Sequence, residues 1–332
     1  MAPDAFDPCQ RDFVEHTRYL FVDVAQKHAI QSGARPARRA VFRKTHGVVH
    51  AQLTLDPERP AAIRHGIFSE GEYRVWLRFS SDIAPDETDA SNGTVGVGMK
   101  LFGITSPTLA NADWTAPTAD ILLQNHDVFF VDTGSDMCSF TDLSLKGHEA
   151  DWYAEHPETQ TILHDMQKRE ESVLTATYWS VLPYACGAEH AVKYRLSPEA
   201  VGPSLGLNGD PNRLRSDLAK RLCRENSRFV FSVQLPRPGV NLPVDKATVR
   251  WTETEAPFIP VAKVDIPAQD VATEGQEAYG DALAFSPWRT PDSNRPLGSI
   301  AESRRRTYPS SAAQRHYVNG QVDAEPHEPR RP

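Results

Sequence analysis

The sequence predicts an α+β fold, in which an antiparallel sheet or barrel carries attached helices. Strand-like segments rich in β-branched and aromatic residues dominate residues 45–265. Helix-like segments flank these strands or are inserted between them. The two kinds of segment do not alternate regularly, which argues against a parallel βαβ sheet. We therefore expect residues 1–332 to form a single domain, with a barrel and its inserted helices over residues 45–265.

The N-terminal residues 10–33 are expected to form a helix, because apolar residues recur at three- and four-residue intervals and Gly33 ends the pattern. Beyond this helix, strand-like segments are separated by clusters of Asp, Asn, Gly and Pro that favour turns. These segments lie at residues 48–55, 73–81, 95–104, 120–133 (a strand followed by a turn), 175–187, 190–198, 228–235 and 246–254.

Further helices are expected inside the strand-rich region and after it. Residues 140–172 have helical character that a proline interrupts, and residues 212–225 form another candidate helix. The C-terminal segment 280–320 is rich in loops at first and ends in a helix. Residues 321–332 are polar and rich in proline, so we expect a disordered tail there.

Composition and charge limit the classes of function. Hydrophobic residues make up 39% and charged residues 24% of the 332-residue chain, as in ordinary globular proteins. The formal net charge of -8 argues against a nucleic-acid partner but allows a local cationic pocket. No apolar run approaches the ~20 residues that cross a bilayer, and no secretory signal is visible. We therefore expect a cytoplasmic protein without a membrane span.

Several common sites are not expected from the cysteines and glycines. The four cysteines lie far apart and form no CxxC pair, so we expect reduced thiols rather than a zinc site or a disulfide scaffold. The glycine-rich "GTVGVG" has neither the spacing nor the following helix of a dinucleotide loop. The P-loop pattern GxxxxGK[ST] and the nucleophile pattern GxSxG are also absent from the sequence.

The C-terminal stretch "ESRRRTYPSSAAQRH" contains a candidate metal ligand. Arg304 and Tyr308 are four residues apart, so a helix places them on one face, and Arg315 returns to about the same face. A guanidinium within ~4–6 Å favours the phenolate form of a tyrosine. A phenolate oxygen is a ligand suited to ferric haem. Taken alone, the same spacing more often belongs to a surface tyrosine with a basic neighbour on a helix.

Three upstream stretches carry further polar residues on strand-like segments. "RKTHG" contains Arg43 and His46, three residues apart. "LRFSS" places Arg78 and Ser80 on one face of a strand. "LLQNHDVFF" places Asn125 shortly before two phenylalanines. Each stretch alone has an ordinary structural explanation: a strand histidine, an exposed charge, a strand hydroxyl or a turn asparagine.

Taken together and in this order, these stretches resemble the catalase superfamily. That family carries Arg-x-x-His, Arg-Phe-Ser and Asn-x-x-Val-Phe-Phe segments, then Arg-x-x-x-Tyr and a further arginine seven residues past the tyrosine. "YWSVLPYACGAEHAVKYRL" and "SPWRTPDSNRPLGSI" also look like the small catalase-related bacterial haem proteins. The resemblance spans about Asp12 to Asn319, and the chain is much shorter than a typical catalase. It implies a catalase-like antiparallel β-barrel with flanking helices.

The resemblance also implies a cofactor, a ferric haem b buried between the barrel and the C-terminal helix. Tyr308 would be its tyrosinate ligand, and Arg304 would be the charge partner of that ligand. Phe130 matches an aromatic residue near the haem face. Three further residues match the arginines that pair with the haem propionates: Arg43, Arg78 and Arg315.

On the distal side, the resemblance assigns His46 as the acid and base, Asn125 as a residue that holds peroxide, and Ser80 as a partner of the histidine. Thr45 departs from the valine of typical catalases, and a similar Thr-His pair occurs in catalase-related allene oxide synthases. His50, in "VVHA", is a second candidate for the distal histidine. We prefer His46 because only His46 has an arginine three residues before it.

The implied function is a haem-dependent peroxidase. Such an enzyme cleaves the O–O bond of hydrogen peroxide or an organic hydroperoxide and oxidises a small-molecule substrate. Two alternatives remain open. The first is an enzyme that rearranges or cleaves fatty-acid hydroperoxides, or a dedicated biosynthetic haem enzyme. The second is a barrel that binds haem or lipid without turnover. A homodimer is compatible with the resemblance.

Overall fold

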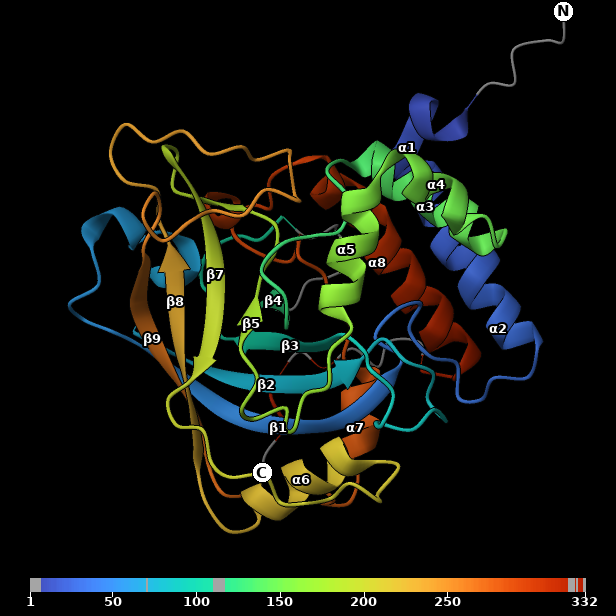
Figure 1. Cartoon of the computed structure of the whole chain (residues 1–332). Helices are drawn as coiled ribbons and strands as arrows, with labels where there is room; N and C mark the ends of the chain where they lie inside the picture. Colours follow the sequence, from blue (N-terminus) through green and yellow to red (C-terminus); the bar gives the residue numbers. More distant parts are fainter. Residues whose placement is uncertain (1–6, 70, 110–116, 322–325, 327, 331–332) are drawn as a thin grey trace, which may run out of the picture.

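The computed structural model describes residues 7–69, 71–109, 117–321, 326 and 328–330 (Figure 1). Within this part of the chain, an antiparallel β-barrel carries a group of helices on one side (Figure 1). The α+β prediction is thereby confirmed. Most of the tail for which disorder is expected lies outside the described residues.

Eight strands close the barrel in the order β5-β4-β3-β2-β1-β9-β8-β7, and β5 pairs with β7 to complete the ring. A ninth strand, β6, pairs with β7. The strands are β1 (Lys44–Leu55), β2 (Glu72–Ser81), β3 (Val95–Phe102), β4 (Thr118–Gln124), β5 (Tyr178–Trp179), β6 (Tyr184–Cys186), β7 (His190–Pro198), β8 (Ser227–Gln234) and β9 (Phe258–Ile266).

Alternation along the strands separates two faces of the barrel wall. Val49, Leu77 and Met99 point inward and belong to the large hydrophobic core that fills the barrel. On β2, Arg78 and Ser80 alternate with Leu77 and Phe79, so they point outward, toward the helices. The outer face of β2, β3 and β4 therefore forms one wall of the space between the barrel and the helices.

An N-terminal helical segment and six further α-helices are present in the described part of the chain. The N-terminal segment consists of α1 (Pro8–Arg18), a π-helical stretch (Tyr19–Gln26) and α2 (Lys27–Gln31), close to the expected helix over residues 10–33. The remaining helices are α3 (Gly134–Leu145), α4 (Glu149–Glu155), α5 (Pro157–Met166), α6 (Arg213–Leu222), α7 (Gln276–Ala282) and α8 (Ser299–Val318). Three short 3₁₀ turns lie at Ala61–Ile63, Gly66–Phe68 and Asp292–Asn294. Helix α8 packs against α1 and α3 (Figure 1).

One prediction about secondary structure is wrong and another is confirmed. The expected strand at 246–254 is wrong, because this segment is irregular. Its backbone N–H groups bond to the loop before α3 instead of a neighbouring strand: Ala247 donates to the carbonyl of Asp132 at 3.2 Å and Thr248 to its carboxylate at 3.1 Å. The expected break in residues 140–172 is confirmed, since α5 begins at Pro157.

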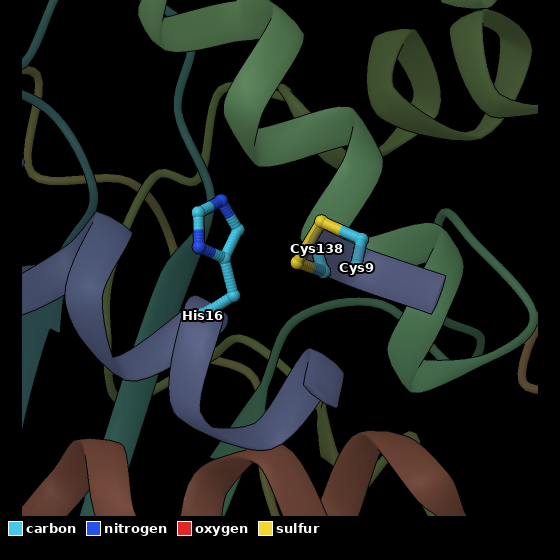
Figure 2. A group of neighbouring side chains, drawn as sticks. All are labelled: Cys9, His16 and Cys138. Atoms are coloured by element: carbon cyan, nitrogen blue, oxygen red, sulfur yellow. A yellow bond between two sulfur atoms is a disulfide. The ribbon is translucent and has the colours of Figure 1, made fainter. Parts of the chain in front are cut away.

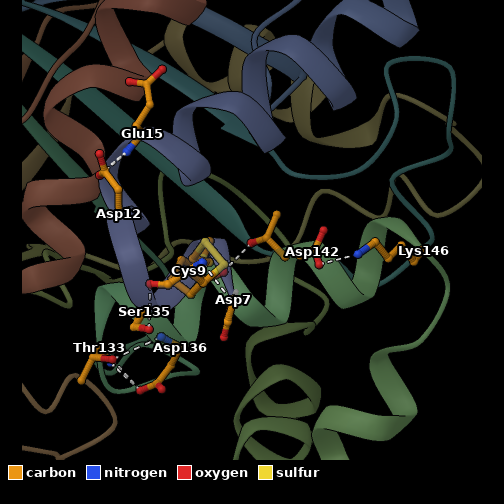
Figure 3. The surroundings of a disulfide bond; sticks show 12 residues. Asp7, Cys9, Asp12, Glu15, Thr133, Ser135, Asp136, Asp142 and Lys146 are labelled. Atoms are coloured by element: carbon orange, nitrogen blue, oxygen red, sulfur yellow. Dashed lines mark hydrogen bonds and ion pairs between the residues drawn. A yellow bond between two sulfur atoms is a disulfide. The ribbon is translucent and has the colours of Figure 1, made fainter. Parts of the chain in front are cut away.

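The expectation that all four cysteines are reduced is also wrong. Cys9 of α1 and Cys138 of α3 form a disulfide across a sequence separation of 129 (Figure 3). The packing of α1 against α3 brings them together, and no local spacing could reveal this. Asp7 caps α1, and Thr133 with Asp136 forms a capping box at the start of α3, so both helix ends near the disulfide are well defined.

Candidate functional site

A cavity of about 500 Å³ lies between the outer face of β2–β4 and the helices. Its walls come from the N-terminal segment, the residues before β1, strands β2–β4, the chain around β5, helices α3, α5 and α8, and the chain before Phe285. Predicted site residues that line this cavity are Arg78, Ser80, Phe130, Arg304, Tyr308 and Arg315. Those that do not line it are Arg43, Thr45, His46 and Asn125.

Helix α8 brings Arg304 and Tyr308 to the cavity together. Both side chains are partly buried, one turn apart on the same face. The guanidinium of Arg304 also lies over the ring of Phe129, with its central carbon 5.4 Å from the ring centroid. Pro309 follows Tyr308 directly inside the helix, so one backbone hydrogen bond is missing beside the tyrosine.

Three arginines from separate elements line the same cavity. Arg39 precedes β1, Arg78 lies on β2, and Arg315 lies on α8. Arg78 is only 4% exposed. Burial, together with the charges of Arg39 and Arg315, lowers the pKa of Arg78 well below its ordinary value, and Asp281 opposes this shift. We call Arg39, Arg78 and Arg315 the cavity arginines.

Contacts of the cavity arginines fix their guanidinium groups. Arg78 donates hydrogen bonds to the hydroxyl of Thr45 at 2.7 Å and to the carbonyl of Phe42 at 3.1 Å. Arg315 donates to the carbonyl of Leu283 at 3.1 Å and also to that of Asp281. Arg39 donates to the carbonyl of Leu283 as well. Thr45 therefore acts on the site indirectly, as an acceptor for Arg78.

Two glycines keep the barrel wall flat where it faces the cavity. Gly96 and Gly98 of β3 lie opposite Ser80 and Arg78 of β2. A Cβ atom on Gly96 would come within 2.7 Å of the Phe42 ring, and a Cβ atom on Gly98 within 3.1 Å of the Phe285 ring. The absence of side chains at these positions lets the rings of Phe42 and Phe285 approach the backbone closely.

His46 points to the opposite face of the barrel wall. The register of β1 with β2 shifts between Thr45 and Gly47, so His46 is the extra residue of a β-bulge. Its Nε2 lies 3.0 Å from the hydroxyl of Ser81, and its Nδ1 lies 3.9 Å from a carboxylate oxygen of Asp89. Burial lowers its pKa to about 4, although Asp89 acts in the opposite direction.

Asn125 and Arg43 also have surroundings away from the cavity. The side-chain oxygen of Asn125 accepts a hydrogen bond from Val95 N at 3.1 Å, and its amide nitrogen donates to Glu170 at 2.7 Å. Arg43 is half-buried and lowers the pKa of Asp82 through its charge. His50 lines a second cavity, about 810 Å³ in volume, that Tyr308 does not reach. No imidazole lines the first cavity among the described residues.

Sequence reasoning missed most of the lining of the first cavity, including Arg39, Phe42, Asp82 and Gln124. Arg39 and Phe42 have the same three-residue spacing as Arg43 and His46, so the sequence offers two overlapping solutions. Phe42 adopts a left-handed backbone conformation with φ 51°, a strained state for a phenylalanine. Asp82 lies two residues after Ser80, a spacing that strand alternation could have highlighted.

One further cluster has the composition of a metal site. Ligand atoms of Cys9, His16 and Cys138 lie within 4.8 Å of one another (Figure 2). Both sulfur atoms are consumed by the disulfide, so they offer no thiolate to a metal ion. His16 stacks on Tyr19 with ring centroids 5.6 Å apart. Among the helices described, none is long and apolar enough to cross a membrane.

Comparison with known proteins places this architecture. No protein-family model matches the chain, and neither does any curated sequence. Solved catalases match in structure across most of the chain. The chain has a catalase-like fold. A fungal catalase superposes with a TM-score of 0.66 over 89% of this chain, at 15% identity.

Two further catalases give the same result. A bacterial catalase matches with a TM-score of 0.67 over 88% of this chain, at 16% identity. Catalase A from Saccharomyces cerevisiae matches with a TM-score of 0.68 over 88%, at 14% identity. This chain spans 63%, 59% and 65% of the three catalases, in the order given. At such identity the likeness establishes the fold, and the chemistry must be argued from this chain's own cavity.

Proposed function

We propose that this chain binds a ferric haem b in the cavity and acts as a peroxide-dependent oxidoreductase. The observation that carries the proposal is that Tyr308 and Arg304 of α8 share one cavity with Arg39, Arg78 and Arg315. A phenol beside a guanidinium suits ferric iron, and a cluster of guanidinium groups suits an acidic macrocycle. The catalase-like fold adds to this support.

The residues present fit such a cofactor. The Nε atom of buried Arg78 has no hydrogen-bond partner within the described residues. The like charges of Arg39 and Arg315 repel the charge of Arg78. Carboxylates brought by a ligand would relieve both conditions. Gly96 and Gly98 leave the barrel wall flat beside the arginines. These features suit a flat, apolar ligand with two carboxylates at one edge.

In this proposal each group has one task. Tyr308 would bind the iron, with the guanidinium of Arg304 one helical turn before it. Arg39, Arg78 and Arg315 would hold the propionates, and Arg39 takes the place that the sequence suggested for Arg43. Phe130 would pack beside the macrocycle. When bound, the haem would supply the redox chemistry for cleaving an O–O bond, while the protein binds and orients the peroxide.

The apolar part of the cavity favours an organic substrate. Its residues come from the N-terminal segment and from helices α3 and α5. We call this surface the apolar wall: Phe21, Met137, Phe140, Leu163 and Met166. A hydrogen peroxide molecule needs no such surface, whereas an organic hydroperoxide or an aromatic co-substrate gains from burying its apolar atoms there. We therefore expect oxidation of organic co-substrates to exceed release of oxygen from hydrogen peroxide.

The first experiment titrates haemin into the purified chain and records the absorption spectrum. The wild type is expected to give a high-spin ferric Soret band at one haem per chain, and Tyr308→Phe is expected to lose or shift it. Tyr317→Phe is the matched control, because Tyr317 lies on the same helix and is 77% exposed. Equal spectra for all three proteins would refute the role of Tyr308.

A haem or lipid carrier without turnover is the second candidate function. It is favoured by one observation, that no imidazole lines the cavity among the described residues. Haem-loaded protein that consumes neither hydrogen peroxide nor cumene hydroperoxide would support it. Product analysis distinguishes a peroxidase from an enzyme that rearranges hydroperoxides. The latter would convert a fatty-acid hydroperoxide in the absence of any co-substrate.

A further inference from the structure

Asp82 is the carboxyl group of the cavity. The titratable side chains that line the cavity, among the described residues, are arginines, Tyr308 and Asp82. An arginine keeps its proton throughout the physiological range, and Tyr308 is committed to the iron in the proposed function. Asp82 is therefore the only described group in the lining that is suited both to accept a proton and to return it.

The carboxyl group of Asp82 is held in a defined position. Its Oδ1 accepts a hydrogen bond from the backbone N–H of Thr94 at 2.9 Å, and the Thr94 hydroxyl also bonds to the carboxyl. In return the backbone N–H of Asp82 donates to the Thr94 carbonyl at 3.1 Å. Thr94 itself lines the cavity. This pairing fixes the carboxyl just beyond the paired ends of β2 and β3.

Gln124 of β4 is a second observation that points to a ligand at the same end. Its side chain lines the cavity and is only 8% exposed. Its amide nitrogen Nε2 has no hydrogen-bond partner in the described part of the chain. A buried donor without an acceptor is costly, and an acceptor atom supplied by a ligand would remove that cost.

Strand register brings these groups to one place. Ser80 of β2 and Gln124 of β4 both pair with Gly96 of β3, so the two side chains stand on the same face on either side of a glycine. Asp82 and Thr94 follow directly at the ends of β2 and β3. We call Ser80, Asp82, Thr94 and Gln124 the polar end of the cavity.

The electrostatic surroundings of Asp82 agree with a group that exchanges protons. Burial raises its pKa, while the hydrogen bonds from Thr94 and the charge of Arg43 act in the opposite direction. Two further charged residues lie near this end. Arg78 is on β2, and Lys168, in the segment after α5, forms a β-bridge with Gly93. The carboxyl group therefore titrates closer to neutrality than an exposed aspartate.

We propose that Asp82 is the proton-transfer group of the cavity, with Gln124 as a hydrogen-bond donor to the same peroxide. The carboxylate takes the proton from one peroxide oxygen and returns it to the departing oxygen. The O–O electron pair leaves with that oxygen, which departs as water or an alcohol, so no net proton is gained or lost. This inference rests on the proposed function, because a bound haem would supply the two electrons that the remaining oxygen requires.

Fluoride binding to the haem-loaded protein tests the inference without turnover. A protonated carboxyl group can donate a hydrogen bond to bound fluoride, whereas a carboxylate repels it. The wild-type affinity is therefore expected to fall about tenfold per pH unit above the pKa of Asp82. Asp82→Asn keeps a permanent donor, so its fluoride affinity is expected to stay level over the same range. Gln124→Leu is expected to lower the affinity without changing the slope.

Asp86→Asn is the matched control, because Asp86 is exposed in the same loop and does not line the cavity. Its fluoride affinity should depend on pH with the same slope as in the wild type. The initial rate with cumene hydroperoxide is expected to fall by ~10²-fold or more in Asp82→Asn alone. If Asp82→Asn does not fold, Asp82→Glu serves instead, and it should keep a pH-dependent affinity with a displaced midpoint.

The outcomes separate this inference from the proposed function. If no variant binds haemin, the proposed function fails and the inference fails with it. If haem binds with the expected spectrum but Asp82→Asn retains both the wild-type pH slope and the wild-type rate, the inference alone is overturned.

Discussion

Two buried charged clusters lie on opposite faces of the β1–β2 pair, and they differ in kind. On the face shared with the barrel interior, Lys44 pairs with Asp89 at 2.7 Å, beside neutral His46. We call these three residues the interior cluster. On the outer face, the three cavity arginines lie near one carboxylate, that of Asp281, which is 4.0 Å from Arg39. A balanced ion pair needs no further partner, whereas an excess of like charge favours a ligand of opposite charge.

The partners of the interior cluster explain why it is structural. Asp89 accepts a hydrogen bond from the backbone N–H of Leu214 at 3.0 Å, and Arg213 donates to the Asp89 carbonyl at 3.1 Å. The cluster thus ties α6 to the start of β1 and to the loop between β2 and β3. His46 belongs to this arrangement by its contacts, which is why an Arg-x-x-His spacing was a misleading guide to the cavity.

The largest expected effect comes from breaking the interior ion pair. Lys44→Met leaves the carboxylate of Asp89 buried without its partner, so the free energy of unfolding should fall by about 3–5 kcal/mol. Urea denaturation of the cofactor-free protein measures it. Lys263→Met is the control, because Lys263 is exposed on β9, and an equal loss there would contradict the comparison.

The next effect is a dependence of stability on pH that comes from His46. Its folded pKa is about 4, below the ordinary value of 6.5, so the unfolded chain binds this proton first. The contribution is fully present above pH 6.5 and is lost as pH falls toward 4, with a total of about 3 kcal/mol. His46→Gln should remove this pH-dependent component. Urea denaturation of the wild type and of His46→Gln between pH 4 and 6.5 measures the difference in their free energies of unfolding. Parallel pH profiles would argue against a buried neutral imidazole.

The smallest effect concerns the cavity arginines. Unlike Lys44→Met, a substitution there should not lower the free energy of unfolding. Arg78→Leu should weaken haemin binding by about 10–150-fold, the equivalent of a charge-assisted hydrogen bond of ~1.5–3 kcal/mol. The cofactor-free variant should be as stable as the wild type or more so, because one of three like charges is gone. Arg74→Leu, at an exposed position of the same strand, should change neither quantity. A large loss of stability in Arg78→Leu would show that the cavity arginines are structural after all.

Sequence patterns predicted the parts of the molecule that depend on local periodicity. The long strands and α8 follow from alternation and helical spacing, and the same spacing placed Arg304 and Tyr308 together. The distal side could not be predicted in this way. The bulge at His46 reverses the direction of one side chain, and only the register with β2 reveals it. Arg39, Asp82 and Gln124 come from separate elements, so their proximity depends on the closed barrel.

The Cys9–Cys138 disulfide has a consequence for the breadth of substrates that the cavity accepts. It joins the segment that leads to Phe21 with the helix that carries Met137 and Phe140, so two parts of the apolar wall are cross-linked. A cross-link limits how far these parts can separate without disturbing the barrel. In oxidising surroundings the protein should therefore be selective for size, and thiol reduction should relax that selectivity while leaving the arginine side of the cavity intact.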